Sequence, residues 1–367
     1  MPIGINNKIL GGTRKWIGLN SGAGIPPVAS FTTSPDPATG EVPLTVSFTD
    51  TSTNSPTSWL WSITPGTEGV DFVYTVGSST SQNPTVRFDT PNNYGVILQA
   101  TNTAGSDTTS STPIYCIDTD AQNYFDELSS QPSDVMKGYY NTFFISLKAG
   151  SNNFGKFDRF WWFGSQYQGN AAVSLKNPTS TDITEVNNPT WTQYRGYTGN
   201  GVDMYLDTNF NIGTSGVNYI QNSSSLGVYS RTNTDGFIID IGCNNGLNRF
   251  SQLDIKDSGL FYGDLNDNGS TVTGKSVSDS MGLFIAVRTS STNIDIYKGN
   301  VLIGSETQNV VGIPTFNVYI LSRNTNGTAA QFSTRQILCS FIASGSINVS
   351  ELDASITQFA TSIGANV

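Results

Sequence analysis

The 367-residue chain contains no histidine. Without histidine, the Ser–His and Cys–His pairs that activate nucleophiles cannot form, and the commonest zinc ligand is missing. Cysteine is also rare, because only Cys116, Cys243 and Cys339 occur, far apart and each in an apolar stretch. This distribution predicts buried free thiols, with one disulfide plus a spare thiol as the alternative.

Charged residues are scarce as well. They make up 13% of the chain, against about 25% in typical soluble domains. The net charge is −10 and no basic patch is present to neutralise phosphates, so nucleic acid is not an expected partner. No run approaches the roughly 18 apolar residues of a membrane-spanning helix, and the first residues lack the apolar core of a secretory signal. We therefore expect neither a membrane partner nor a signal peptide.

Small polar residues and aromatics take the place of charge, and aromatics alone reach 11%. Disordered chains have few aromatics and much charge, so this chain should fold. Its many hydroxyl, asparagine and glycine residues are typical of strands joined by tight turns. The length favours two domains. Ahead of them, residues 1–25 form an apolar, glycine-rich arm in which Arg14, Lys15 and Trp16 would anchor the protein to a partner.

Residues 26–117 contain short alternating segments at about ten-residue spacing, separated by turn clusters. Alternation is clear at 44–48 and 94–100. The pattern predicts a β-sandwich of the immunoglobulin type. The segments 27–31 and 40–52, with Trp59 and Trp61, resemble a PKD domain, an immunoglobulin-like extracellular module, although the acidic turn usual after the second tryptophan is absent. Trp61 is expected in the sandwich core.

Residues 118–150 have a helical rather than a strand pattern. Thr119 is expected to cap a first helix, and a second is expected to start at Pro132, Ser133 and Asp134, with a linker-like role for both at the junction. A third helix is predicted at 350–364, capped by Ser350. The apolar faces predicted for the three helices are Ala121, Phe125 and Leu128; Val135, Tyr139, Phe143 and Leu147; and Leu352, Ile356, Phe359 and Ile363.

Residues 151–367 return to strands, roughly eleven of them before the final helix, including a hairpin at 293–304 that turns at Gly299 and Asn300. So many strands favour a jelly-roll sandwich of two sheets. The order of elements, with segments 196–202, 206–211 and 223–230, resembles the concanavalin A-like (laminin G-like) jelly rolls of tailed-bacteriophage structural proteins. The predicted fold is thus all-β: an immunoglobulin-like sandwich, then a larger jelly roll with a few peripheral helices.

Two candidate sites follow from these strands. Asp264, Asn266 and Asn268 precede Gly269 with the alternate spacing of a calcium loop, but the twelfth position is Lys275, where a bidentate glutamate belongs. A tight turn explains the same residues, so calcium is an optional rather than a required cofactor. An aromatic platform for sugar stacking is the second candidate, with core packing as the alternative. Its members would be Trp161, Trp162, Trp191, Tyr194 and Tyr197, with Trp161 and Trp162 on opposite faces of one strand.

Catalysis is not predicted. Glycoside hydrolysis needs a pair of neighbouring carboxylates, and the few glutamates form no such cluster. Asp203, Asp207, Asp240 and Asp254 are scattered along the chain.

The main functional hypothesis is a non-enzymatic, multicopy structural protein on the surface of a tailed-phage virion, as a capsid decoration, head fibre or tail-associated adhesin. It would attach to other virion proteins through the N-terminal arm and bind host-surface glycans with its sandwiches. A bacterial cell-surface carbohydrate-binding protein is the alternative, followed by a glycoside hydrolase.

Overall fold

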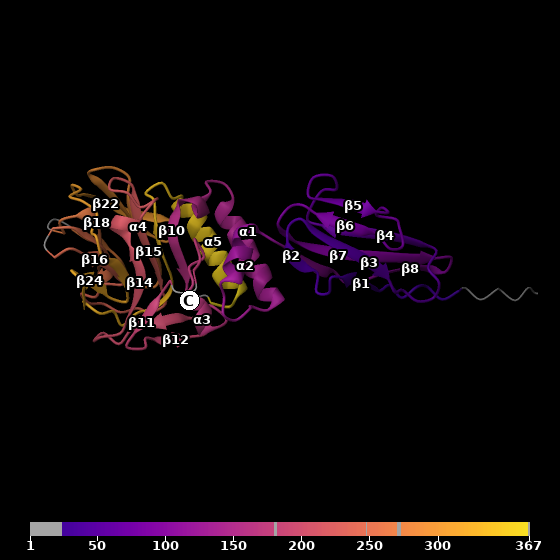
Figure 1. Ribbon diagram of the computed structural model, residues 1–367, viewed down its shortest axis with the longest axis horizontal. Coiled ribbons are helices and arrows are strands. Elements are labelled where there is room, and N and C mark those ends of the chain that lie inside the picture. The colour runs from indigo at the N-terminus through magenta and orange to yellow at the C-terminus, as the bar shows by residue number, and fades with distance from the viewer. Residues whose placement is uncertain (1–23, 180–181, 247, 270–272, 366–367) are drawn as a thin grey trace, which may run out of the picture.

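The computed structural model describes residues 24–179, 182–246, 248–269 and 273–365. Two β-rich bodies follow one another along the long axis, with helices between them (Figure 1). This confirms the predicted all-β class with peripheral helices. The expected anchoring residues Arg14, Lys15 and Trp16 lie outside the described residues.

The first body is a sandwich of two sheets, with strand orders β1-β3-β6-β5 and β2-β9-β7-β4 and with β8 paired to β7. Trp61 is 3% exposed and contacts the rings of Phe31 and Phe48, as expected for the core tryptophan. Its strands are β1 Phe31–Ser34, β2 Thr39–Glu41, β3 Leu44–Asp50, β4 Ser58–Thr64, β5 Phe72–Val76, β6 Thr85–Phe88, β7 Asn92–Asn102, β8 Gly105–Thr108 and β9 Thr112–Ile117.

The second body is a larger sandwich made of an eight-stranded and a nine-stranded sheet. The eight-stranded sheet has the order β12-β13-β26-β15-β20-β21-β22 with β10 beside β26. Its strands are β10 Phe157–Trp162, β12 Thr190–Thr192, β13 Gly196–Thr198, β15 Ser224–Ser230, β20 Gly282–Arg288, β21 Asn293–Lys298, β22 Val301–Thr307 and β26 Gln336–Ala343.

The nine-stranded sheet has the order β11-β14-β23-β16-β17-β18-β19, with β24 beside β16 and β25 beside β24. Inward-facing apolar residues of the two sheets form one buried core between them. The predicted hairpin forms from β21 and β22, and Gly299 in its turn has φ +57°, a left-handed value that suits glycine. The strands of this sheet are β11 Thr184–Val186, β14 Tyr205–Asn211, β16 Ile241–Asn244, β17 Phe250–Asp257, β18 Leu260–Asp267, β19 Lys275–Ser276, β23 Asn317–Ile320, β24 Arg323–Thr325 and β25 Thr328–Ala330.

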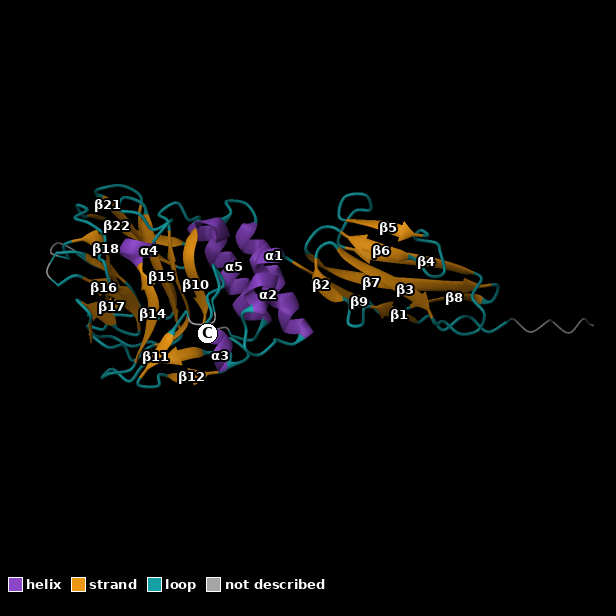
Figure 2. Ribbon diagram, viewed as in Figure 1, coloured by secondary structure: helices purple, strands orange, loops and turns teal. Residues whose placement is uncertain are grey.

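Three helices cover the outer face of the eight-stranded sheet: α1 Thr119–Asp126, α2 Asp134–Lys148 and α5 Val349–Ser362 (Figure 2). Helix α2 packs along α5, where the rings of Phe143 and Phe359 stack with centroids 4.5 Å apart. Shorter helical segments are η1 Asn153–Lys156, α3 Gln168–Ala171 and α4 Ile212–Ser215.

The helix ends and one helix face differ from prediction. Asp118 caps α1 in place of Thr119, and Asn348 caps α5 in place of Ser350, because these side chains accept the free backbone N–H groups of Asp120 and Glu351. The buried face of α2 is rotated as well, since Val135 is 54% exposed. The face that packs on the sheet is formed by Met136, Tyr140, Phe143, Phe144 and Leu147. The apolar stripe of α5 is buried as predicted.

A polar network joins the first sandwich to α2. The side chain of Asn141 accepts from the backbone N–H of Asp118 (2.8 Å) and donates to the carbonyl of Cys116 (2.9 Å). Asn93 of β7 donates to the carbonyl of Gly138 (3.0 Å). The Tyr115 ring lies so close to Gly138 that a Cβ there would come within 2.4 Å of it. Strand β9 and helix α2 are therefore in direct contact at the junction.

All three cysteines are buried and free, which confirms the prediction of buried thiols. Each lies in a different apolar core: Cys116 in the first sandwich, Cys243 between the two larger sheets and Cys339 beneath the helices. Burial raises the pKa of the Cys116 thiol to about 12. None of the helices in the described ranges is long and apolar enough to cross a membrane.

Candidate functional site

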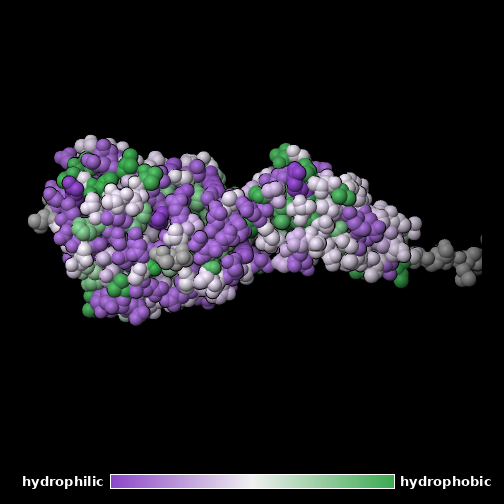
Figure 3. Space-filling view, viewed as in Figure 1, coloured by the Kyte–Doolittle hydropathy of each residue, from purple (hydrophilic) through white to green (hydrophobic). Residues whose placement is uncertain are grey.

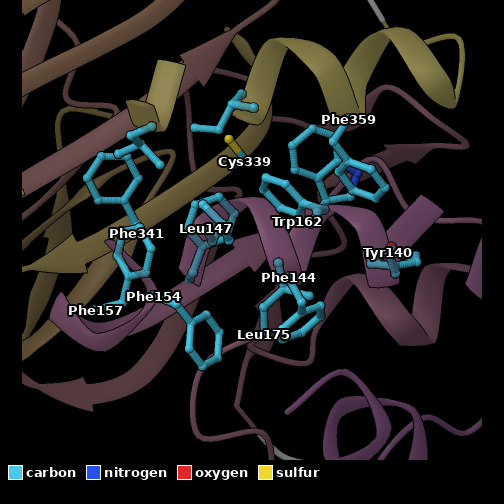
Figure 4. Packing of buried hydrophobic residues seen from close by; sticks show 14 of the residues in the cluster. Tyr140, Phe144, Leu147, Phe154, Phe157, Trp162, Leu175, Cys339, Phe341 and Phe359 are labelled. Atoms are coloured by element: carbon cyan, nitrogen blue, oxygen red, sulfur yellow. The ribbon is translucent and has the colours of Figure 1, made fainter. Parts of the chain in front are cut away.

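The predicted aromatic platform is not formed, because Trp161 and Trp162 are fully buried. Trp161 and Trp162 do point to opposite faces of β10, as alternation requires. Trp161 lies in the core between the sheets, and Trp162 faces the helices, where it contacts Phe143 and Phe359 (Figure 4). The helices cover the face that was expected to be open, so neither indole can stack on a sugar.

The other three members of the platform are also engaged. Tyr197 is fully buried and donates its hydroxyl to Glu185. Trp191 is half-buried and donates its indole N–H to the carbonyl of Phe163 at 2.9 Å. Tyr194 is half-buried and packs against the helix-covered core. These side chains hold the edge of the eight-stranded sheet and do not form a common outer surface.

The residues considered for calcium are not brought together. Strand β18 has a bulge at Asn266, whose φ is +61°, so the alternation of side chains is broken there. Asn266 turns inward and accepts hydrogen bonds from Tyr219 (3.1 Å) and Ser251 (3.0 Å). Asp264 faces outward, and Asn268 is exposed beyond the strand. The described part of the chain contains no cluster of three or more acidic, cysteine or histidine side chains arranged for a metal.

The outward side of Asp264 opens into a cleft of about 330 Å³ on the outer face of the nine-stranded sheet. Strands β17 and β18 form its floor, and β24 contributes Arg323. Leu253 and Ile255 of β17 point into the sandwich core, so the alternate residues point into the cleft. The cleft is lined by Phe237, Ile239, Phe250, Gln252, Asp254, Asp257, Tyr262, Asp264, Gly269 and Arg323.

A chain of hydrogen bonds crosses the cleft floor. Arg323 lies over the ring of Phe250, 5.6 Å from its centroid, and donates to the side-chain oxygen of Gln252 at 2.9 Å. Gln252 in turn donates to one carboxylate oxygen of Asp264 at 2.7 Å. These contacts fix the amide of Gln252 and leave the second oxygen of Asp264 without a hydrogen-bond donor among the described residues.

The carboxylate of Asp254 has even fewer compensating contacts than that of Asp264. The Asp254 side chain is buried, and within the described ranges neither carboxylate oxygen makes a well-formed hydrogen bond, although the backbone N–H of Lys256 lies near enough to oppose the rise in pKa. The nearest cation, Arg335, lies 3.9 Å away and is paired more closely with Asp240 at 2.6 Å. Burial, with the negative charge of Asp240, raises the pKa of Asp254 to about 8. Burial and the charge of Asp267 raise the pKa of Asp264 to about 7.

The cleft was missed because Asp254 and Asp264 lie ten positions apart in the sequence, which gives no cluster. The signal was nevertheless present, since both β17 and β18 carry polar residues at alternate positions beside apolar ones. Ser258 and Gly259 join these strands, and pairing across this turn places Gln252 opposite Asp264 and Asp254 opposite Tyr262. Because residues 264–269 were interpreted as a metal loop or a turn, β18 was not recognised as a strand paired with β17.

Replacing Asp254 by asparagine should change how stability depends on pH. The folded-state pKa of about 8 lies above the ordinary aspartate pKa of 3.8, so between these limits the folded protein retains a proton that the unfolded chain releases. Stability of the native protein is therefore lost as pH rises through this window. Relative to wild type, Asp254→Asn should gain up to about 1.4 kcal/mol of unfolding free energy per pH unit, measured by urea denaturation. For the exposed control Glu127→Gln, the difference in unfolding free energy from wild type should stay constant over this pH range. The same constancy in Asp254→Asn would contradict the raised pKa of Asp254.

Comparisons with known proteins add little to this geometry. No protein-family model matches the sequence, and no curated protein matches it. Among solved structures, the CBM40 module of the Ruminococcus gnavus IT-sialidase is 13% identical, with 47% of this chain and 96% of that chain covered and a TM-score of 0.33. The NanB sialidase of Streptococcus pneumoniae is 12% identical, with 47% and 27% covered and a TM-score of 0.32. The binding domain of botulinum neurotoxin serotype D is 12% identical, with 56% and 52% covered and a TM-score of 0.38. The chain itself is a β-sandwich protein with a cleft on the outer face of its nine-stranded sheet.

Proposed function

We propose that this protein binds glycans without cleaving them, and that the cleft over β17 and β18 is the binding site. The observation that carries the proposal is the meeting of an exposed aromatic ring with unsatisfied polar groups. Phe237 is 59% exposed at the cleft, where it offers a flat apolar surface to a sugar ring. Beside it, Asp254 and Asp264 have oxygens without donors. Sugar hydroxyls are donors of the required kind.

The wider role is proposed from the arrangement of the two sandwiches. The sheet that carries β16, β17 and β18 lies at the opposite end of the long axis from the first sandwich (Figure 1). The core of the first sandwich is formed by described residues between Phe31 and Cys116, which supports a module of its own at 26–117. Such a module would act as a spacer that holds the cleft away from an attachment point, for which the arm at Arg14, Lys15 and Trp16 remains the candidate.

A display protein of this kind fits the surface of a tailed-phage virion, and a bacterial cell surface is the alternative setting. The support for the phage setting is the resemblance of the PKD-like and jelly-roll segments. Either setting is extracellular, and both would gain from many copies, because several weak contacts then act together. Purified virions analysed by mass spectrometry would distinguish the two settings.

The binding proposal is tested by titrating the full chain with a panel of oligosaccharides in a calorimeter. We expect binding by the native protein and a loss of at least about fivefold in affinity for Phe237→Ala, since one aromatic contact contributes about 1 kcal/mol. Tyr167→Ala is the matched control, because Tyr167 is also an exposed aromatic (41%) but lies outside the cleft. Equal losses of affinity in both variants, or no binding to any oligosaccharide, would refute the proposal. Release of shorter oligosaccharides would instead show that the protein hydrolyses its ligand.

A further inference from the structure

Carboxyl groups outnumber basic groups around the cleft. Asp254, Asp257 and Asp264 line it, against the single guanidinium of Arg323. The neighbouring buried charges offer no compensation, because they are already paired. Arg335 is paired with Asp240 at 2.6 Å. Likewise, Arg288 lies 3.5 Å from Asp267, with both side chains fully buried.

We infer that the cleft selects sugars that carry a free ammonium group, such as unacetylated hexosamines, over neutral and anionic sugars. This inference rests on the proposed glycan-binding function and specifies its ligand class. Two features of the site carry it: the excess of carboxyl groups, and buried carboxylate oxygens that no donor of the described protein satisfies.

An ammonium group supplies what these oxygens lack. It has three N–H donors and a positive charge, whereas a hydroxyl has one donor and no charge. Hydrogen bonds between charged partners are roughly twice as strong as those between neutral ones. The aromatic rings of Phe237 and Tyr262 line the same cleft, and ring faces attract cations. A sugar with an ammonium group would thus satisfy the acids and the rings together.

The two acids are close enough for one ligand to reach both. Asp254 lies opposite Tyr262, and Gln252 lies opposite Asp264. Asp254 and Asp264 are therefore diagonal neighbours, for which the usual separation is about 7–8 Å. That spacing lets an ammonium contact one carboxylate while a hydroxyl of the same or the next sugar residue contacts the other.

The arginine does not make the cleft a site for acidic sugars. Its Nε donates to Thr325 at 2.9 Å, its Nη1 donates to Gln252 at 2.9 Å, and its plane lies over Phe250. An incoming carboxylate would have to displace these partners. It would also lie beside Asp257, and its negative charge would make Asp254 and Asp264, whose pKa values are already raised, still harder to ionise.

Ligand binding should release a proton. In the free protein at about pH 6, Asp254 is protonated, because its pKa is raised to about 8 by burial and by Asp240. An ammonium group beside it favours the ionised form. The heat of binding should then depend on the ionisation enthalpy of the buffer, whereas a neutral sugar would leave the carboxyl protonated.

The experiment is calorimetry of the full chain at about pH 6 with three ligands: a glucosamine tetramer, its fully N-acetylated counterpart and sialyllactose. We expect the glucosamine tetramer to bind at least about tenfold more tightly than the other two, a difference of about 1.4 kcal/mol. Its binding heat should differ between buffers. Asp254→Asn should remove most of this preference, and asparagine should be tolerated because the native carboxyl is uncharged at this pH.

Controls separate this selectivity from general attraction to an acidic protein. Glu127→Gln makes the same carboxyl-to-amide change at an exposed position directly after the end of α1 and should leave the preference intact. An equal loss in Glu127→Gln, or equal or tighter binding of the N-acetylated or sialylated ligand, would overturn the inference while leaving glycan binding in place. Failure of all three ligands, together with every other oligosaccharide tested, would instead remove the proposed function itself.

Discussion

Arg335→Met should lower the free energy of unfolding by about 3–5 kcal/mol, the range for breaking one half of a buried ion pair. Arg335 and Asp240 are both fully buried, with 2.6 Å between Nη1 and the carboxylate. Nη2 also donates to the carbonyls of Thr234 (2.9 Å) and Lys256 (2.7 Å). Methionine fills similar volume but provides neither charge nor donors, so the buried Asp240 would lose its countercharge and keep only hydrogen bonds from Ser333 and the backbone of Ile255. Each of the two carbonyls would also lose one of its donors. Guanidinium denaturation of the full chain measures the change.

The control for this prediction is the exposed pair of Arg87 and Asp89, at 2.7 Å. Arg87→Met should cost less than about 1 kcal/mol, because water compensates the lost partner. The double variant Arg335→Met with Asp240→Leu should recover much of the loss, since it removes the uncompensated carboxylate. If Arg335→Met proves as mild as Arg87→Met, the buried ion pair does not stabilise the larger sandwich as described.

Trp162→Ala should cost about 3–5 kcal/mol, the range for truncating a large buried aromatic. The indole is fully buried between the eight-stranded sheet and the helices, 4.6 Å from the ring centroid of Phe359. Alanine would leave a cavity beneath both α2 and α5. Because this layer depends on that contact, backbone amides of the two helices should exchange faster with solvent, which hydrogen exchange followed by mass spectrometry would detect.

Trp59→Ala is the matched tryptophan control, since Trp59 is half-buried in the first sandwich and bonds Asp50 at 2.8 Å. It should cost clearly less and leave exchange in α2 and α5 unchanged. Equal costs for the two variants, or faster exchange confined to regions away from the helices, would contradict the role assigned to Trp162.

Much of the fold could be predicted from local patterns. Alternation and turn residues located the hairpin at Gly299, and the apolar stripe of α5 was evident at Leu352, Ile356 and Phe359. These features depend on neighbours close in sequence, so the sequence displays them directly. Helix caps were less certain, because Asp118 and Thr119, or Asn348 and Ser350, are all good caps. Only the path of the backbone decides between them.

The candidate site could not be predicted in the same way. Whether Trp162 is open or covered depends on where α2 and α5 pack, and that contact joins segments about two hundred positions apart. The face of Asn266 depends on a β-bulge, which reverses the expected direction of a side chain. The cleft depends on pairing β17 with β18, so Asp254 and Asp264 become neighbours only in the folded sheet.

The helix layer also limits how the protein could hold a surface. Because α1, α2 and α5 occupy the outer side of one sheet, the larger sandwich has one open sheet face, directed away from the first sandwich (Figure 2). Figure 3 shows the same view with a mostly hydrophilic surface on the larger sandwich. A single molecule would then bind one sugar chain at a time. Strong attachment would depend on how densely neighbouring copies are spaced, and that spacing would have to match the spacing of chains on the target.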